Sequence, residues 1–474
     1  MLACELESRV MREGQHLGTA ELQELRRTAA EIENVIATGP IVSAVAPDEI
    51  RSHLMSRYDF SKPVELDEVV TDVEEMLRKW QVQVTHPRYF GLFNPSVTIA
   101  SVMADLLVAM YNPQLATWRT SPAANEIERH TLTWLAGKFG LPECAVSNFT
   151  SGGEESNFSA VAVALAHAFP ELAEGGLQAL AALPVIYLTG GAHHGFRKIA
   201  RLTGLGRTAL RIVAVDADLR MDVTDLARQV SQDRESGLTP FMVIATAGTT
   251  AAGVIDPLAD VAKFCRAENL WFHVDAAWGG AAIISPRLRK HLDGISDADS
   301  ITCDAHKWFS VPMGAGMFFC RHRCAVLSAF ESEVSFMPGK TAAVLDPYTS
   351  TFQWSRRFIG LKLFLALAER GESGYAKMIE HQAEMGEVLR RSLERTGWRI
   401  VNRTPLPLVC FTRDGLIPSE FLAKLYKHQI AWMSQVQLND EYPVLRACVT
   451  SFRTTENDIE WVVGEMNRIV SSTI

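Results

Sequence analysis

Between residues 98 and 330 the chain alternates two patterns. Short, nearly continuous apolar runs are separated by longer stretches in which apolar residues recur at helical spacing. Such runs are typical of strands buried on both faces of a sheet, and their alternation with helices predicts a mostly parallel sheet in an α/β fold. The predicted strands are Val185–Leu188, Arg211–Val215, Met242–Ala245, Trp271–Val274, Ser300–Thr302 and Gly316–Cys320.

The regions on either side of this stretch have other patterns. Apolar residues recur at helical spacing between Leu22 and Ile36, and a second helix is expected from Leu66 to Trp80. Residues 331–353 have no clear periodicity and contain proline, glycine, serine and threonine. A segment of this length without periodicity predicts a functional or mobile loop.

The last hundred residues mix helical stretches with strand-like runs. A helix is expected from about Arg356 to Arg370, and apolar runs follow at Leu406–Phe411 and Val444–Val449. This mixture predicts a smaller α+β domain. The chain is therefore divided into an N-terminal helical segment, a large α/β domain and a small C-terminal domain, with bounds 1–85, 86–365 and 366–474.

Composition narrows the class of protein. The 474 residues are 47% apolar and 21% charged, which is typical of a globular enzyme. A net charge of −9 argues against nucleic-acid binding. No apolar run approaches the roughly 18 residues of a membrane span, and the first residues lack the apolar region of a signal peptide. Eight scattered cysteines without zinc-site spacing predict reduced thiols, a cytoplasmic protein and no metal.

Residues that follow the predicted strands are the candidates for chemistry, because ligands in such sheets bind beyond the carboxyl ends of the strands. Thr150–Asn157 (TSGGEESN) has two glycines before an expected helix, which would let backbone N–H groups hold an anion. His193 follows a strand and could stack on a flat ring or carry a proton. Each also has an ordinary explanation, as a glycine turn capped by Ser151 and as a structural histidine.

Two further segments place charged residues after strands. Asp275 ends the apolar run in WFHVDAAWGG, and a carboxylate buried there needs a cation or donors. Lys307, in DSITCDAHKW, could form a Schiff base with an aldehyde. Taken alone, Asp275 could cap a helix and Lys307 could be a surface charge. In this order, the four segments could bind an anion, stack on a flat ring, pair with a protonated ring nitrogen and form a Schiff base with an aldehyde. These are the four interactions that pyridoxal 5′-phosphate (PLP) needs.

The chain resembles the group II PLP-dependent amino-acid decarboxylases, which include aromatic-amino-acid and glutamate decarboxylases. Its motifs stand in family order from about residue 80 to residue 370, with a further match in the C-terminal region. The resemblance implies the fold-type-I (aspartate aminotransferase-like) architecture and a homodimer with active sites at the subunit interface. The matching segments are HPRYFGLFNP, SPAANEIE, TSGGEESN, AHHGFRKIARLTGLG, LRMDVTDL, ATAGTTAAGVIDP, HVDAAWGG, DAHKW, SRRFIGLKLF and LRACVTSFRTTENDI.

The resemblance also assigns cofactor residues. Lys307 would hold PLP as a Schiff base, and Asp275 would pair with the ring nitrogen. Glu154 departs from the family, in which a small residue is usual; only its backbone is expected to contribute, because a carboxylate would repel the phosphate. The remaining assignments are His193 and Ala277 on the two faces of the ring, Thr246 near the ring hydroxyl, and the backbone of Gly153 and Glu154 with Ser300 and His306 at the phosphate.

One assignment concerns the proton that replaces CO2. Relatives of the aromatic type use a tyrosine on a mobile loop to protonate Cα. Tyr348 is the only tyrosine between residues 331 and 353, so the resemblance assigns it this role. The ordinary alternative is that Tyr348 is packed within the loop.

Substrate residues are expected in the HPRYFGLFNP segment, where Leu92, Phe93 and Asn94 are the candidates. No basic side chain is assignable to a distal carboxylate, which favours an apolar or aromatic amino acid over glutamate. Arg446 and Arg453 are further candidates for contact with an anion. A decarboxylase should not clamp the α-carboxylate tightly, because this would stabilise the ground state of the group that leaves as neutral CO2.

The expected activity is decarboxylation of an L-amino acid to its amine and CO2, with the amino acid as a small-molecule partner. Three alternatives stay open. An aldehyde synthase uses the same scaffold with oxygen in place of the proton, and a loop phenylalanine in place of tyrosine would favour it. An aminotransferase would accumulate a keto acid, and a non-catalytic dimer would fail to bind PLP.

Overall fold

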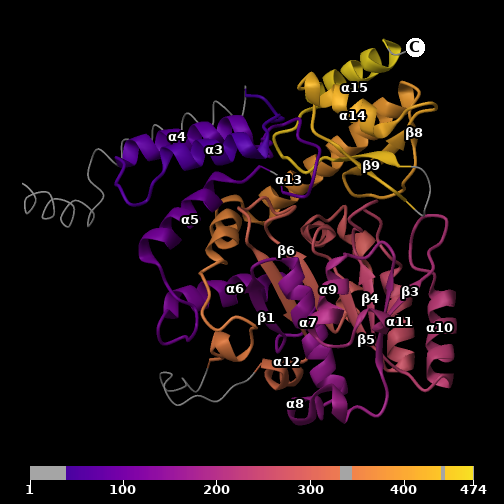
Figure 1. Cartoon of the computed structure of the whole chain (residues 1–474). Coiled ribbons are helices and arrows are strands. Elements are labelled where there is room, and N and C mark those ends of the chain that lie inside the picture. Colours follow the sequence, from indigo (N-terminus) through magenta and orange to yellow (C-terminus); the bar gives the residue numbers. More distant parts are fainter. Residues whose placement is uncertain (1–38, 95, 331–343, 439–442, 473–474) are drawn as a thin grey trace, which may run out of the picture.

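The computed structural model describes residues 39–94, 96–330, 344–438 and 443–472. The predicted helix between Leu22 and Ile36 lies outside this range. The predicted helix Leu66–Trp80 is confirmed as α4, which follows α3 (Pro47–Arg57). Both helices stand apart from the main body, and α5 (Ile99–Tyr111) leads back toward it (Figure 1).

A seven-stranded sheet forms the centre of the molecule, in the order β1-β7-β6-β5-β4-β2-β3. Only β7 runs antiparallel to its neighbours, so the predicted mostly parallel sheet is confirmed. β1 was not predicted, because its apolar run is interrupted by Ser147 and Asn148. The strands are β1 (Val146–Thr150), β2 (Pro184–Thr189), β3 (Leu210–Val213), β4 (Thr239–Thr246), β5 (Trp271–Asp275), β6 (Ser300–Asp304) and β7 (Gly316–Cys320).

Both faces of this sheet are buried. Along β4, Val243 and Ala245 belong to one hydrophobic cluster, and Met242 and Ile244 belong to another. Successive side chains of a strand point to opposite faces, so the unbroken apolar run reflects burial of both faces. The helices of this part are α6 (Pro122–Lys138), α7 (Gly153–Ala168), α8 (Leu172–Gly175), α9 (Gly195–Leu202), α10 (Val223–Glu235), α11 (Leu258–Glu268) and α12 (Arg323–Phe330), with 3-10 turns η1 (Gly176–Ala179), η2 (Arg207–Ala209), η3 (Gly279–Ile284), η4 (Arg289–Leu292), η5 (Ile295–Asp297) and η6 (Pro347–Thr349).

A smaller sheet in the order β10-β11-β9-β8 follows the long helix α13 (Leu361–Arg395). The helix expected at 356–370 therefore begins later and continues much further. Gly371, at φ +65°, breaks the helical geometry, and the expected domain boundary at 365/366 lies inside α13. The other elements are β8 (Arg399–Ile400), β9 (Leu408–Thr412), α14 (Pro418–Lys427), β10 (Ser434–Val436), β11 (Val444–Cys448) and α15 (Glu456–Ser471).

Residues 86–93 are attached to this smaller sheet although they lie far from it in the sequence. The backbone N–H of Phe90 donates to the carbonyl oxygen of Trp432 (2.8 Å), and the carbonyl oxygen of Phe90 accepts the backbone N–H of Cys448 (2.9 Å). Tyr89 stacks on Trp432 with 5.2 Å between ring centroids. The segment expected to line the substrate pocket is therefore held by the C-terminal residues.

Candidate active site

The carboxyl ends of adjacent strands bring the candidate residues together. Thr246 ends β4 and Asp275 ends β5, and the two are paired in register. Asp304 ends β6, next to Gly316 of β7, which in turn pairs with Thr150 at the end of β1. All these strand ends meet at one edge of the sheet, as expected for a ligand site in this class of fold.

Lys307 lies at this edge beside the carboxylate of Asp304, and the charge of Asp275 also acts on it. Its Nζ is 3.0 Å from Oδ2 of Asp304, and its side chain is 20% exposed. Burial lowers the pKa of Lys307, but the charges of Asp304 and Asp275 outweigh burial and hold this pKa above its ordinary value. The structure therefore brings Lys307 and Asp275 into one electrostatic cluster.

Asp275 is 4% exposed and is held by two donors. Its Oδ2 accepts the side-chain N–H of Asn157 (2.9 Å), and its Oδ1 accepts the backbone N–H of Ala277 (3.1 Å). These bonds fix the carboxylate at the end of β5 and place Ala277 beside it. An anion in this position is suited to a protonated ring nitrogen.

A chain of buried hydrogen bonds continues from Asn157 away from the site. Asn157 Oδ1 bonds to Nε2 of His273 (3.0 Å), and Nδ1 of His273 bonds to the hydroxyl of Ser300 (2.9 Å), which also accepts the indole N–H of Trp271 (2.9 Å). Since Asn157 donates to Asp275, its oxygen must accept from His273, so His273 carries its proton on Nε2. Burial lowers the pKa of His273 to about 4, in keeping with a neutral ring.

The structure does not bring Ser300 to the phosphate side. Ser300 begins β6, whereas Asp304 ends it, and a strand rises roughly 3.3 Å per residue. Its hydroxyl is already used by Trp271 and His273. We therefore leave Ser300 out of the proposed phosphate site, since it supports Asp275 instead. Neither Asn157 nor His273 was predicted as a site residue, although His273 stands two residues before Asp275 and so on the same face of β5.

The glycine turn lies where the resemblance places the phosphate. A Cβ added to Gly153 would lie 2.8 Å from Oδ2 of Asp304 and 3.3 Å from Cβ of Ala277, so the backbone approaches the site closely. His306 is 6% exposed and lies near the preceding glycine of the turn. Glu154 turns its carboxylate outward to Lys198 (3.1 Å), which leaves its backbone free to serve the turn.

His193 follows β2 at the same edge of the sheet. Its Nδ1 accepts the backbone N–H of Gly195 (3.1 Å), which directs a proton on the neutral ring to Nε2. The ring is exposed in this single chain. It is therefore accessible for stacking on a ligand at the strand ends.

Phe93 and Arg446 form the neighbouring wall. Lys307 Nζ lies 5.6 Å from the ring centroid of Phe93, and the guanidinium carbon of Arg446 lies 5.0 Å from it. Arg446 donates to the carbonyls of Gly91 and Thr250, while its Nη2 is buried without a hydrogen-bond partner among the described residues.

The other substrate candidates differ from Phe93 in their surroundings. Leu92 is 52% exposed and Asn94 is half-buried. No contact of either side chain with Lys307 is found in the described part of the chain. Arg453 is half-buried, and its guanidinium lies 5.9 Å from the ring centroid of Phe452. The structure thus brings Phe93 and Arg446 to the cluster, but not the other candidates.

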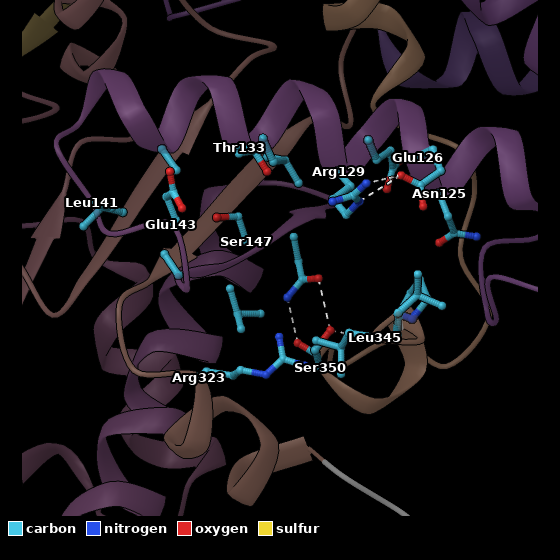
Figure 2. A pocket seen from close by; sticks show the side chains of 18 of the residues that line it. Asn125, Glu126, Arg129, Thr133, Leu141, Glu143, Ser147, Arg323, Leu345 and Ser350 are labelled. Carbon is cyan, nitrogen blue, oxygen red and sulfur yellow. Dashed lines mark hydrogen bonds and ion pairs between the residues drawn. The ribbon is translucent and has the colours of Figure 1, made fainter. Parts of the chain in front are cut away.

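Tyr348 is buried in a separate, anchored region. The backbone N–H of Tyr348 donates to the carbonyl oxygen of Ala116 (3.1 Å). Its ring packs on Trp354 with 4.7 Å between ring centroids. Figure 2 shows the adjoining cavity of about 200 Å³, where Asn148 of β1 donates to the carbonyl of Ser350 (2.8 Å) and accepts from its hydroxyl (3.3 Å). Neither Ala116 nor Trp354 belongs to the strand ends that carry Lys307, so within one chain Tyr348 is not part of that cluster.

Polar atoms left without partners fit PLP. The hydroxyl of Thr246, expected near the ring hydroxyl, is buried and makes no hydrogen bond to any described residue. Lys307, Asp275 and the glycine turn offer an amine, an anion and a close backbone approach. In contrast, no group of three or more His, Cys, Asp or Glu side chains suited to a metal ion occurs in the described ranges. Nor does any described helix have the length and apolarity of a membrane span.

The family match agrees with this chemistry. Residues 48–413 match the pyridoxal-dependent decarboxylase conserved domain, which is more than half of the chain. The chain therefore belongs to this family of PLP-dependent amino-acid decarboxylases, with PLP as its cofactor.

Individual relatives extend the match. Tryptophan decarboxylase 2 of Oryza sativa subsp. japonica is 30% identical over 383 residues, which cover 78% of this chain and 76% of the relative. Phenylacetaldehyde synthase of Arabidopsis thaliana is 28% identical over 415 residues, covering 86% and 83%. The crystal structure of Oryza sativa TDC with PLP and tryptamine superposes with a TM-score of 0.89 at 23% identity, covering 96% of this chain and 99% of that one. The predicted fold-type-I architecture is thereby confirmed.

Proposed function

We propose that this protein removes the α-carboxylate of an L-amino acid with an apolar or aromatic side chain, giving the amine and CO2. The observation that carries the proposal is the joint position of Lys307 and Asp275 at adjacent strand ends, with the ring of Phe93 on the neighbouring wall. The first two residues serve the cofactor, and Phe93 offers an apolar surface to a substrate side chain.

PLP supplies the electron sink for the decarboxylation when it is bound. Lys307 would anchor it, Asp275 would hold a proton at the ring nitrogen, and Thr246 would face the ring hydroxyl. His193 and Ala277 would cover the two faces of the ring, and the backbone of Gly153 and Glu154, with His306, would hold the phosphate. These roles are supported by the positions of the residues at the strand ends.

Arg446 suits weak contact with a substrate carboxylate. Its Nε and one N–H of Nη1 are bound to carbonyls, while Nη2 has no partner among the described residues. Because Nε is occupied, the side-on bidentate clamp through Nε and Nη2 is not open to a carboxylate. Loose contact of this kind is compatible with loss of the carboxylate as CO2.

A second copy of the chain is the proposed source of the remaining parts of the site. Helix α5 exposes an apolar face that continues along its length, formed by Ile99, Val102, Met103, Leu107, Met110 and Tyr111. An exposed patch of this size marks an interaction site. In such a dimer, Tyr348 would serve the partner's site and protonate Cα. The absence of acidic or basic residues from this face suits burial against another apolar surface. The proposed location of the protein is the cytoplasm.

Product analysis tests the proposed reaction. PLP-loaded protein mixed with pooled L-amino acids should convert one of them into an amine lighter by CO2, as detected by mass spectrometry. Lys307→Ala should abolish multiple turnover, because the anchoring amine is lost. Steady turnover by this variant would contradict the role of Lys307, and a keto acid as the main product would show aminotransfer instead.

An aldehyde synthase is the second candidate. It is favoured by the similarity to the Arabidopsis phenylacetaldehyde synthase and by the anchoring of Tyr348 away from Lys307. The two functions differ in oxygen consumption and peroxide release. If Tyr348 protonates Cα, Tyr348→Phe should lower amine yield and raise peroxide; peroxide as a major product of the unmodified enzyme would favour the aldehyde synthase.

A further inference from the structure

Asp304 is a buried carboxylate to which the proposed reaction gives no role. It ends β6, three residues before Lys307, and is 1% exposed. The ammonium of Lys307 is its ion-pair partner, and neither of its carboxylate oxygens accepts a further hydrogen bond from any residue that the structure describes. A buried carboxylate that is served by a single ammonium is costly, so its retention at this position needs an explanation.

Three groups surround this carboxylate. Nζ of Lys307 lies 3.0 Å from Oδ2, and Nε2 of His306 lies 3.6 Å from the same oxygen. The third neighbour is the glycine turn, because a Cβ added to Gly153 would lie 2.8 Å from Oδ2 and 3.2 Å from Oδ1. Asp304 thus packs directly against the first residue of α7.

The same end of α7 is the proposed position of the cofactor phosphate. α7 is 16 residues long, and its first turn offers backbone N–H groups and the positive end of the helix dipole. Asp304 already places a negative charge beside this end. A phosphate bound at Gly153 and Glu154 would bring a second negative charge to it, and like charges in a poorly solvated site oppose each other.

We propose that Asp304 sets the affinity of the site for the phosphate of the cofactor, by holding a negative charge beside the helix end that receives it. The proposal rests on the proposed phosphate position at Gly153 and Glu154. In the cofactor-free protein, the ammonium of Lys307 compensates Asp304. The site consequently binds the phosphorylated aldehyde less tightly than the same helix end would with a neutral residue at position 304.

A different explanation is that Asp304 acts only on Lys307. Asp275 offers a matched control, because both carboxylates raise the pKa of Lys307, whereas the atoms nearest to a Cβ on Gly153 are the carboxylate oxygens of Asp304. A ligand without phosphate separates the two explanations. An effect on the lysine alters the binding of any aldehyde, whereas an effect on the phosphate requires that group.

The experiment compares PLP with pyridoxal, which has the aldehyde but no phosphate. Dissociation constants of both would be measured by equilibrium dialysis on cofactor-free full-length protein, for the unmodified chain, Asp304→Asn and Asp275→Asn. The ratio of the pyridoxal constant to the PLP constant should rise about tenfold or more in Asp304→Asn, which corresponds to removal of one nearby like charge. The ratio should stay unchanged in Asp275→Asn.

An unchanged ratio in Asp304→Asn would overturn the inference, even if both ligands bind more tightly by the same factor. Asp304→Ser removes the charge with a smaller side chain and replaces Asp304→Asn if that variant does not fold. Failure of the unmodified protein to bind PLP would instead overturn the proposed cofactor site. Measured binding with an unchanged ratio would leave the cofactor site standing and reject only the role of Asp304.

Discussion

At the scale of single residues, the position of Asp275 depends on a chain of buried side chains behind it. Asn157 donates to Asp275, and His273 orients Asn157 from behind. The carboxylate is therefore held at the end of a chain that begins at Trp271. Loss of an inner member of this chain should therefore affect the carboxylate of Asp275 at its end.

Asn157→Ala tests this dependence. It leaves Oδ2 of Asp275 without its side-chain donor, and a lost hydrogen bond to a buried charged group costs about 1–3 kcal/mol. We expect the dissociation constant for PLP to rise about tenfold, measured by equilibrium dialysis. Ser159→Ala is the control, because among the described residues its hydroxyl bonds only to the carbonyl of Glu155 on the same helix. Unchanged affinity in Asn157→Ala would show that the backbone N–H of Ala277 alone holds Asp275.

The sequence identified Lys307 and Asp275 because each follows a strongly apolar strand, and this local pattern decides where a side chain lies. Ser300, assigned to the phosphate by the resemblance, begins β6, at the opposite end from Asp304, and a polar residue near a strand gives no sign in the sequence of which end faces the ligand. Asn157 was not recognised because its role depends on a contact with β5, far along the chain. Asp304 lies within the DAHKW motif, but its burial and its contact with Gly153 are visible only in three dimensions.

At the scale of elements, the segment before α13 is fixed by a buried ion pair. Arg356 donates to Glu128 of α6 (2.6 Å), which also accepts the N–H of Gly360 at the start of α13 (2.9 Å). Both side chains of the pair are 4% exposed. Glu128 therefore fixes both Arg356 and Gly360 to α6, and these two residues connect the segment that carries Tyr348 to α13.

Glu128→Gln keeps the shape of the side chain and removes its charge. Arg356 would then be a buried cation without a counter-charge, which costs about 3–5 kcal/mol. We expect the free energy of unfolding to fall by this amount in urea denaturation. Arg129→Ala, which breaks an exposed pair with Glu126 on the same helix, should cost less than about 1 kcal/mol. Equal effects of the two variants would contradict the importance of burial.

The strands of the large domain were predicted from apolar runs because burial on both faces leaves little room for polar residues. β1 escaped notice because Ser147 and Asn148 are polar, and Asn148 is satisfied by Ser350, which is 202 residues away. The later start of α13 likewise follows from contacts of Arg356 and Gly360 with α6. Local periodicity does not contain these long-range contacts.

At the scale of the whole molecule, buried histidines make stability depend on pH. Burial lowers the pKa of His273 and that of His86 to about 4, below the ordinary 6.5. The unfolded chain therefore binds more protons than the folded chain between pH 6.5 and 4, and stability falls as the pH is lowered through this window. Burial raises the pKa of Asp256 to about 6, which opposes this loss between pH 6 and 3.8.

We expect a net loss of stability on acidification, because the destabilising contributions of His273 and His86 together exceed the opposing contribution of Asp256. Each histidine contributes up to about 3 kcal/mol across the window. Urea unfolding at pH 6.5, 5.5 and 4.5 measures the slope. His273→Gln should make the slope shallower, since one titrating group is removed. A slope that is identical in His273→Gln and in the unmodified protein would contradict the buried, neutral state of His273.

The proposed dimer can be tested on the exposed face of α5. Met103→Glu places a charge in the centre of this face and should shift the protein to a monomer, as measured by light scattering after size exclusion. Ile212→Glu is the matched control, because Ile212 is also exposed but lies on β3, at the far edge of the sheet. A dimer that persists in Met103→Glu would place the contact elsewhere.

The attachment of residues 86–93 to the small sheet has a consequence for how substrate preference can be inherited or redesigned. The wall that carries Phe93 is bonded to Trp432, Cys448 and Arg446, so it forms one module with the C-terminal region in spite of its distance along the chain. A chimaera that exchanges only the C-terminal region would separate these partners. Transfer of a relative's preference to this scaffold should therefore require both segments to be exchanged together.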